Sequence, residues 1–99
     1  TIVDGYAASA ASIIMLAGTK RKILKNSTVL IHQLRTGFYG KFEDLQDEHT
    51  NCEHLMDNMK NIYVENTKFT KKKIDALIKR EKYLTSDECL QLGIVHEII

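Results

Sequence analysis

Apolar and polar positions along the chain predict strands that alternate with helices. Two apolar runs, residues 1–3 and 28–32, are predicted as buried strands, and the second ends on a histidine. Residues 4–6 are predicted as a turn. Small residues over 9–17 predict a helix closed by Gly18. Alternation of this kind is typical of the α/β class.

The clearest periodic signal is a seam of side chains spaced alternately by three and four residues. Its members are Phe42, Leu45, His49, Cys52, Met56, Met59 and Tyr63. The seam predicts one long helix over residues 43–68, about 36–39 Å long at about 1.5 Å per residue. So small a domain has little surface to cover such a face, so the seam also predicts a partner helix, in this chain or another. A long core helix within the domain is the alternative.

Local signals predict two short helices and a final strand in the C-terminal third. Thr70 can cap a helix that carries Ile74, Leu77 and Ile78. Thr85 and Glu88 form a capping box at the start of a second helix. Gly93 is predicted to end that helix, and residues 94–95 to begin the last strand.

Composition and charge narrow the function classes only a little. The 99 residues suit one small domain, and a net charge of +1 gives no electrostatic reason to expect nucleic acid or a membrane surface. We interpret the basic clusters at 20–22 and 71–73 as solvated faces. The longest apolar run, 10–17, is too short to span a bilayer. Cys52 and Cys89 lack paired spacing, which favours reduced thiols.

A segment of small residues, Gly5-Tyr6-Ala7-Ala8-Ser9-Ala10-Ala11-Ser12, carries the first candidate chemistry. A serine hydroxyl becomes a nucleophile when a base takes its proton, and the alanines leave room for a substrate carbonyl beside Ser9. At a helix N-terminus, unpaired N–H groups can stabilise an oxyanion, and Ala10 N–H is the candidate donor. An ordinary capping serine is the alternative, favoured without further evidence.

His32 is the candidate base for Ser9, because it ends a buried strand where a histidine needs partners or meets a ligand. A core histidine bonded to backbone groups is the alternative. No metal site is expected, since His49 and Cys52 share one helix face but His54 points away. A histidine base needs an acid to hold its tautomer. The sequence does not choose among the candidate acids Asp44, Asp47, Asp57, Asp75, Glu81 and Asp87.

These residues, in order, resemble the proteolytic subunit of the Clp protease (ClpP), a family of serine peptidases. The resemblance rests on Gly-Tyr-Ala-Ala-Ser at 5–9, Ala-Gly at 17–18, and Asn-Ser-Thr-Val-Leu-Ile-His-Gln at 26–33. Tyr-Leu-Thr-Ser-Asp-Glu at 83–88 and Leu-Gly-Ile-Val at 92–95 extend it over essentially the whole chain. It implies a crotonase-like α/β fold with a long protruding handle helix, of which residues 1–99 form the C-terminal portion of a single domain.

The resemblance implies a serine endopeptidase and gives three residues catalytic roles. Ser9 matches the family nucleophile and His32 the family base. The family acid is an aspartate shortly before an aromatic–Leu–Ser/Thr tail, and Glu81 occupies that position. Glutamate fills this role in other Ser-His-acid enzymes, although its extra methylene shifts the carboxylate outward. The order Ser, His, acid differs from that of α/β-hydrolases. Neither a metal nor another cofactor is implied in this chain.

The chain departs from the family pattern in several places, which favours a divergent or viral-type relative. Lys25 and Leu34 stand where the family has proline, Tyr6 where it has a smaller polar residue, and the stretch 18–26 is two residues shorter. The Gly-rich strand-turn that supplies the family's second oxyanion donor would precede Thr1. Since the chain also starts without methionine, we expect a truncated or processed chain whose activity alone is weak or absent.

The resemblance also implies partners. Family subunits form homo-oligomeric rings that stack through handle helices, which would explain the seam from 42 to 63. A partner AAA+ unfoldase that uses ATP would feed unfolded polypeptide to them, in the cytoplasm or, with an upstream targeting segment, in an organelle matrix or stroma. A non-catalytic assembly subunit is the main alternative. An enzyme of the same fold that acts on acyl-CoA thioesters ranks lower, because it would not need a Ser-His pair.

Overall fold

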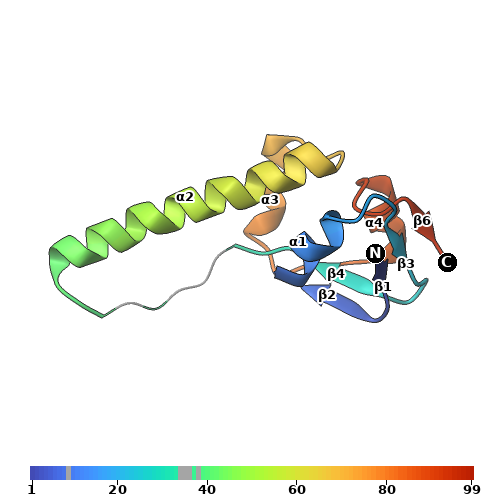
Figure 1. The fold of residues 1–99 in the computed structure, drawn as a ribbon, viewed down its shortest axis with the longest axis horizontal. Coiled ribbons are helices and arrows are strands. Elements are labelled where there is room, and N and C mark those ends of the chain that lie inside the picture. Colours follow the sequence, from blue (N-terminus) through green and yellow to red (C-terminus); the bar gives the residue numbers. More distant parts are fainter. Residues whose placement is uncertain (9, 34–36, 38) are drawn as a thin grey trace.

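Short strands and helices alternate along the chain, and one long helix extends away from them (Figure 1). The computed structural model describes residues 1–8, 10–33, 37 and 39–99. Its helices are α1 (Ala10–Leu16), α2 (Phe42–Asn66), α3 (Lys71–Ile78) and α4 (Ser86–Gln91). Its strands are β1 (Ile2–Val3), β2 (Tyr6–Ala8), β3 (Lys22–Ile23), β4 (Thr28–Leu30), β5 (Tyr83–Leu84) and β6 (Glu97–Ile98). The predicted α/β class is confirmed.

The strands form two small sheets. One has the order β1-β3-β6 and is parallel throughout. The other has the order β2-β4-β5, in which β2 and β4 are parallel and β5 runs antiparallel to β4. Because parallel neighbours need a crossover, α1 connects the β2 end to the region of β3 and β4.

The core lies where the two sheets meet α1, α3, α4 and the C-terminal end of α2. Its least exposed side chains include Ile23, Val29, Ile74, Cys89 and Ile94. Ala7, Val29 and Leu84 occupy one face of the second sheet, as the strand alternation requires, and all three are buried.

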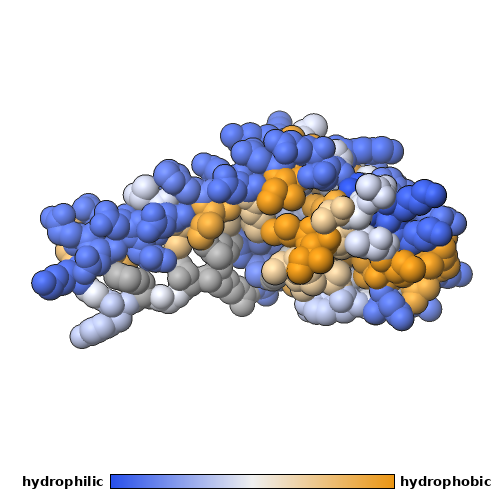
Figure 2. Space-filling view, in the orientation of Figure 1, coloured by the Kyte–Doolittle hydropathy of each residue, from blue (hydrophilic) through white to orange (hydrophobic). Residues whose placement is uncertain are grey.

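Helix α2 confirms the long helix predicted from the seam, and its burial changes along its length. At its N-terminal end Phe42 is 71% exposed and Leu45 49% exposed, whereas Tyr63 near its C-terminal end is 1% exposed. The Tyr63 hydroxyl hydrogen-bonds to the buried Oγ of Ser12, which ties α2 to α1. Hydrophobic residues gather over the body, while the visible face of α2 is mostly hydrophilic along its N-terminal half (Figure 2).

The predicted helix ends that depend on local signals are confirmed. The Thr70 Oγ1 accepts a hydrogen bond from the Lys73 N–H at 3.2 Å at the start of α3. Thr85 and Glu88 form the reciprocal capping box at the start of α4. Gly93 follows α4 with φ +72°, a left-handed conformation that favours glycine.

Three predicted boundaries are wrong. Tyr6 was predicted in a turn but begins β2, paired with Thr28. The strand predicted over 28–32 ends at Leu30, and the last strand is β6 rather than residues 94–95, which are buried before it. The predicted end of the first helix, by contrast, is correct, since α1 ends at Leu16 and Gly18 follows it. The φ of Gly18 is not positive; a Cβ at Gly18 would instead lie 2.6 Å from the Thr1 Oγ1.

Candidate active site

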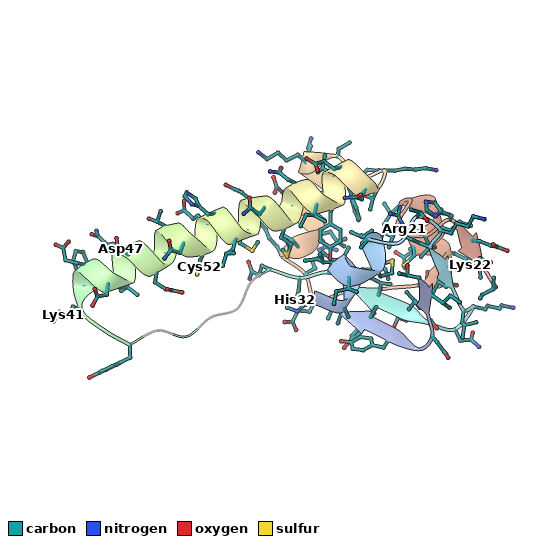
Figure 3. The ribbon with its side chains drawn as sticks, viewed as in Figure 1. Arg21, Lys22, His32, Lys41, Asp47 and Cys52 are labelled. Carbon is teal, nitrogen blue, oxygen red and sulfur yellow. The ribbon has the colours of Figure 1, made fainter. Side chains whose placement is uncertain are left out.

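His32 lies two residues beyond the end of β4, where the chain leaves the sheet (Figure 3). Its side chain is half-buried, and its Nδ1 lies 2.7 Å from the Gln33 carbonyl oxygen. A carbonyl can only accept, so Nδ1 carries the proton in this contact and donates it. In this tautomer Nε2 is the ring nitrogen that bears the lone pair, and a general base acts through such a nitrogen.

The backbone after His32 is held by α3. The Gln33 N–H donates to the Ile78 carbonyl at 3.0 Å, and Ile78 is the last residue of α3. This bond satisfies one of the carbonyl groups that a helix end leaves unpaired. It therefore fixes the segment that carries His32 against the start of the connection that leads to Glu81.

The register of β2 and β4 brings the two predicted catalytic segments to the same edge of a sheet. Ala8 pairs with Leu30 in this parallel pair. The carboxyl ends of parallel strands share one edge, and ligands of open α/β sheets bind there. Ser9 follows Ala8 in the sequence but lies outside the described residues. Ala10, the predicted oxyanion donor, is the exposed first residue of α1.

Glu81 lies in the connection between α3 and β5, and its side chain is exposed. β5 pairs with β4 so that Tyr83 lies opposite Leu30 and Leu84 opposite Val29. Continued by two residues, this antiparallel register sets position 81 opposite position 32. Composition and spacing had left several acidic residues open, and Glu81, which the family resemblance implies, precedes the strand that pairs with β4.

Asp75 and the two cysteines, the other side chains with candidate chemistry, make contacts or are buried away from this edge of the sheet. The Lys60 ammonium lies 2.9 Å from Asp75 and, through that hydrogen bond, lowers the pKa of its carboxyl. Burial raises the pKa of the Cys89 thiol to about 12, so it stays protonated. Burial also raises the pKa of Cys52, as does its contact with Glu48. Neither thiol is therefore an activated nucleophile.

Arg21 is a residue whose environment the sequence did not reveal. It was predicted on a solvated basic face, yet it is only 6% exposed (Figure 3). Desolvation lowers the pKa of its guanidinium, and backbone carbonyl groups from three helix ends surround it. The flanking Lys20 and Lys22 give the segment the composition of a surface, and only the long-range contacts distinguish Arg21.

Tyr6 and Tyr83 form an exposed aromatic pair on the second sheet, with ring centroids 5.6 Å apart.

Among the residues that the structure describes, no group of histidine, cysteine or acidic side chains could hold a metal ion. Within the same part of the chain, none of the helices combines the length and apolar character needed to cross a membrane.

Comparisons with known proteins agree on one family. The family model described as Clp protease matches residues 1–99. A curated relative, the ATP-dependent Clp protease proteolytic subunit 1 of Corynebacterium glutamicum, is 39% identical over 101 residues. That alignment covers 99% of this chain and 49% of the relative, so the chain spans about half the length of the curated relative it matches.

Proposed function

Because this chain belongs to the Clp protease family, we propose that it is the catalytic portion of a serine peptidase that hydrolyses peptide bonds of unfolded proteins. Ser9 is the nucleophile, His32 the general base and Glu81 the acid. The observation that carries the proposal is the pair of registers around β4. In one, the end of β2, which precedes Ser9, lies beside the end of β4, which precedes His32. In the other, Tyr83 lies opposite Leu30, and this register, if continued, would pair position 81 with position 32.

The proposed reaction forms and then breaks an acyl-enzyme. The Ser9 Oγ attacks the scissile carbonyl carbon while His32 Nε2 takes its proton. The Ala10 N–H, at the start of α1, donates to the oxygen on which negative charge develops. His32 then returns the proton to the leaving amine, and water, activated by the same nitrogen, releases the acyl group.

The tautomer of His32 supports its role as base. With Nδ1–H donated to the Gln33 carbonyl, Nε2 is the ring nitrogen that would take the serine proton. Proton uptake makes the ring positive, and a carboxylate then stabilises it more than a neutral carbonyl does. We propose that Glu81 provides this carboxylate.

The proposed assembly uses the exposed part of α2. In the crotonase-like arrangement of the family, α2 would be the handle helix through which homo-oligomeric rings stack. The exposure of Phe42 and Leu45 at its N-terminal end supports this, because apolar side chains in a helical seam favour a partner helix. Partner AAA+ unfoldases would use ATP to deliver unfolded chains, in the cytoplasm or in an organelle matrix or stroma.

A fluorophosphonate probe tests the catalytic proposal. In the full-length, assembled protein, the probe is expected to label Ser9, and Ser9→Ala and His32→Ala are expected to abolish labelling. Ser12→Ala is the matched control, since Ser12 belongs to the same motif but is buried against Tyr63, and its labelling is expected to persist. Folded, assembled wild-type protein that resists the probe would overturn the proposal.

One observation favours a second candidate, a non-catalytic assembly subunit. Position 81 holds glutamate where the family resemblance implies aspartate. For this candidate, rings form normally, peptidase activity is absent, and Ser9→Ala changes neither property.

A further inference from the structure

The Arg21 guanidinium joins the C-terminal ends of three helices. It donates to the Leu16 carbonyl at 3.2 Å, to the Asn66 carbonyl at 2.7 Å and to the Gly93 carbonyl at 3.1 Å. Leu16 and Asn66 are the last residues of α1 and α2, and Gly93 follows α4. Helix ends of this kind carry unpaired carbonyls and partial negative charge, which a buried cation satisfies.

His96, just before β6, lies against the same residue. The Arg21 backbone N–H donates to His96 Nδ1 at 3.0 Å, and the His96 N–H donates to the Arg21 carbonyl at 2.7 Å. An N–H can only donate, so Nδ1 is unprotonated and the neutral ring carries its proton on Nε2. Nε2 lies 3.3 Å from Nη2 of Arg21, whose two hydrogens serve the Asn66 and Gly93 carbonyls.

His96 is exposed, and a second proton on its ring would break the hydrogen bond that Nδ1 accepts from the Arg21 backbone N–H. It would occupy Nδ1 and face the Arg21 backbone N–H, and it would set a positive ring beside the guanidinium. The other charged groups lining this hollow are Lys20, Lys22 and Glu97, and the Glu97 carboxylate lies 3.5 Å from the Lys22 ammonium. The ends of α1, α2 and α4 contribute backbone carbonyls, and the guanidinium already uses these.

We propose that His96 is a proton-sensitive latch for the C-terminal strand: its protonation releases β6 from β3. Besides this contact, the strand is held by its pairing with β3, by its packing against α4 and by Ile98, which packs against the core. It pairs Glu97 with Lys22 and Ile98 with Ile23, and the Ile99 N–H donates to the Ile23 carbonyl at 2.8 Å. Among side chains with ordinary pKa values, histidine is the one whose charge changes between about pH 5 and pH 8, and this general range sets the two pH values of the test.

Hydrogen exchange of the full-length protein at pH 7.5 and pH 5.0 tests the latch. After correction for intrinsic rates, the wild-type amides of residues 96–99 are expected to lose about tenfold in protection at the lower pH. His96→Asn places an amide oxygen where Nδ1 lies and does not titrate, so its protection is expected to be the same at both pH values. His54→Asn, at an exposed position of α2, is the control and keeps the wild-type loss.

Two results would overturn the proposal: equal wild-type protection at both pH values, or a loss in His96→Asn as large as in the wild type. If His96→Asn does not fold, exchange of the His96 ring C2 hydrogen in the wild-type protein replaces it, because that rate reports ring protonation. The midpoint of ring protonation and the midpoint of amide deprotection must then coincide, and separate midpoints would refute the latch.

Discussion

At the residue scale, position 81 shows what chemistry a sequence can and cannot assign. The family resemblance points to Glu81, but composition and spacing leave it among six acidic residues. What favours it physically is the pairing of Leu30 with Tyr83, a contact between residues far apart in the chain. For Arg21, the neighbouring residues in the sequence predict a surface position. Its burial is explained only by its hydrogen bonds to three carbonyl groups at the ends of distant helices.

Two substitutions of Glu81 are expected to distinguish the effect of its charge on activity from the effect of its side-chain length. Glu81→Gln removes the charge that, in the proposed triad, stabilises protonated His32, and we expect kcat/KM on a fluorogenic peptide to fall by about 10²–10⁴ in the full-length protein. Glu81→Asp keeps the charge and is expected to stay within about tenfold of the wild type. Glu43→Gln, an exposed acidic position at the start of α2, controls for a general loss of charge. Unchanged activity in Glu81→Gln would remove Glu81 from the proposed triad.

At the element scale, the features that could be predicted are those whose causes are local. The caps at Thr70 and Thr85 and the long periodic helix depend on residues within a few turns, and the structure confirms them. Strand β2 has no such signal, since Tyr6-Ala-Ala becomes a strand only by pairing with β4. Gly18 could be recognised from the sequence as the end of a helix, but the structure shows that glycine is needed there because Thr1 approaches closely.

The capping box of α4 is expected to give a pH-dependent contribution to stability. The Thr85 backbone N–H, and then the Lys82 ammonium, lower the pKa of Glu88. A carboxyl whose pKa is lower in the folded state stabilises the fold fully above its unfolded pKa of about 4.3, and that contribution disappears as the pH falls through the folded value. Urea unfolding at pH 5.0 and pH 3.0 measures it.

Glu88→Gln is the variant that isolates this contribution, because glutamine can keep the capping bond without titrating. The Glu88 side chain is 34% exposed and screened by solvent. We therefore expect the free energy of unfolding to fall between pH 5.0 and pH 3.0 by only about 0.5 kcal/mol or less more in the wild type than in Glu88→Gln. Asp87→Asn, in the same first turn, should retain the wild-type pH dependence. An identical decrease in the free energy of unfolding at low pH in the wild type and in Glu88→Gln would contradict this account.

At the scale of the whole molecule, the chain measures 50 × 24 × 22 Å because half of α2 lies beyond the rest (Figure 1). Core packing explains the end of α2 near Tyr63, and nothing in the described residues buries Phe42. The periodic pattern therefore predicted the helix correctly, and its exposed half agrees with the expectation of a partner helix.

Polar substitution in the exposed seam is expected to weaken assembly and leave the fold intact. Phe42→Gln and Leu45→Gln remove apolar side chains that are already exposed in the single chain, so circular dichroism and thermal unfolding of the monomer should change little. Sedimentation of the full-length protein should show a loss of the largest species. Gln46→Ala, at an adjacent exposed position, should sediment like the wild type. Unchanged sedimentation in both seam variants would exclude this end of α2 from the interface.

The hydrogen bond between Ser12 and Tyr63 has a mechanical consequence. About 21 residues of stiff helix separate Tyr63 from Phe42, or about 32 Å at about 1.5 Å per residue. A tilt of about 10° at the anchored end would therefore move the far end by about 5–6 Å, roughly the pitch of one helical turn. The anchored end of α2 is held by α1, to which Ser12 belongs, and by α3, where Lys60 pairs with Asp75. A small rearrangement of either helix would therefore be expected to cause a much larger displacement at the far end of α2.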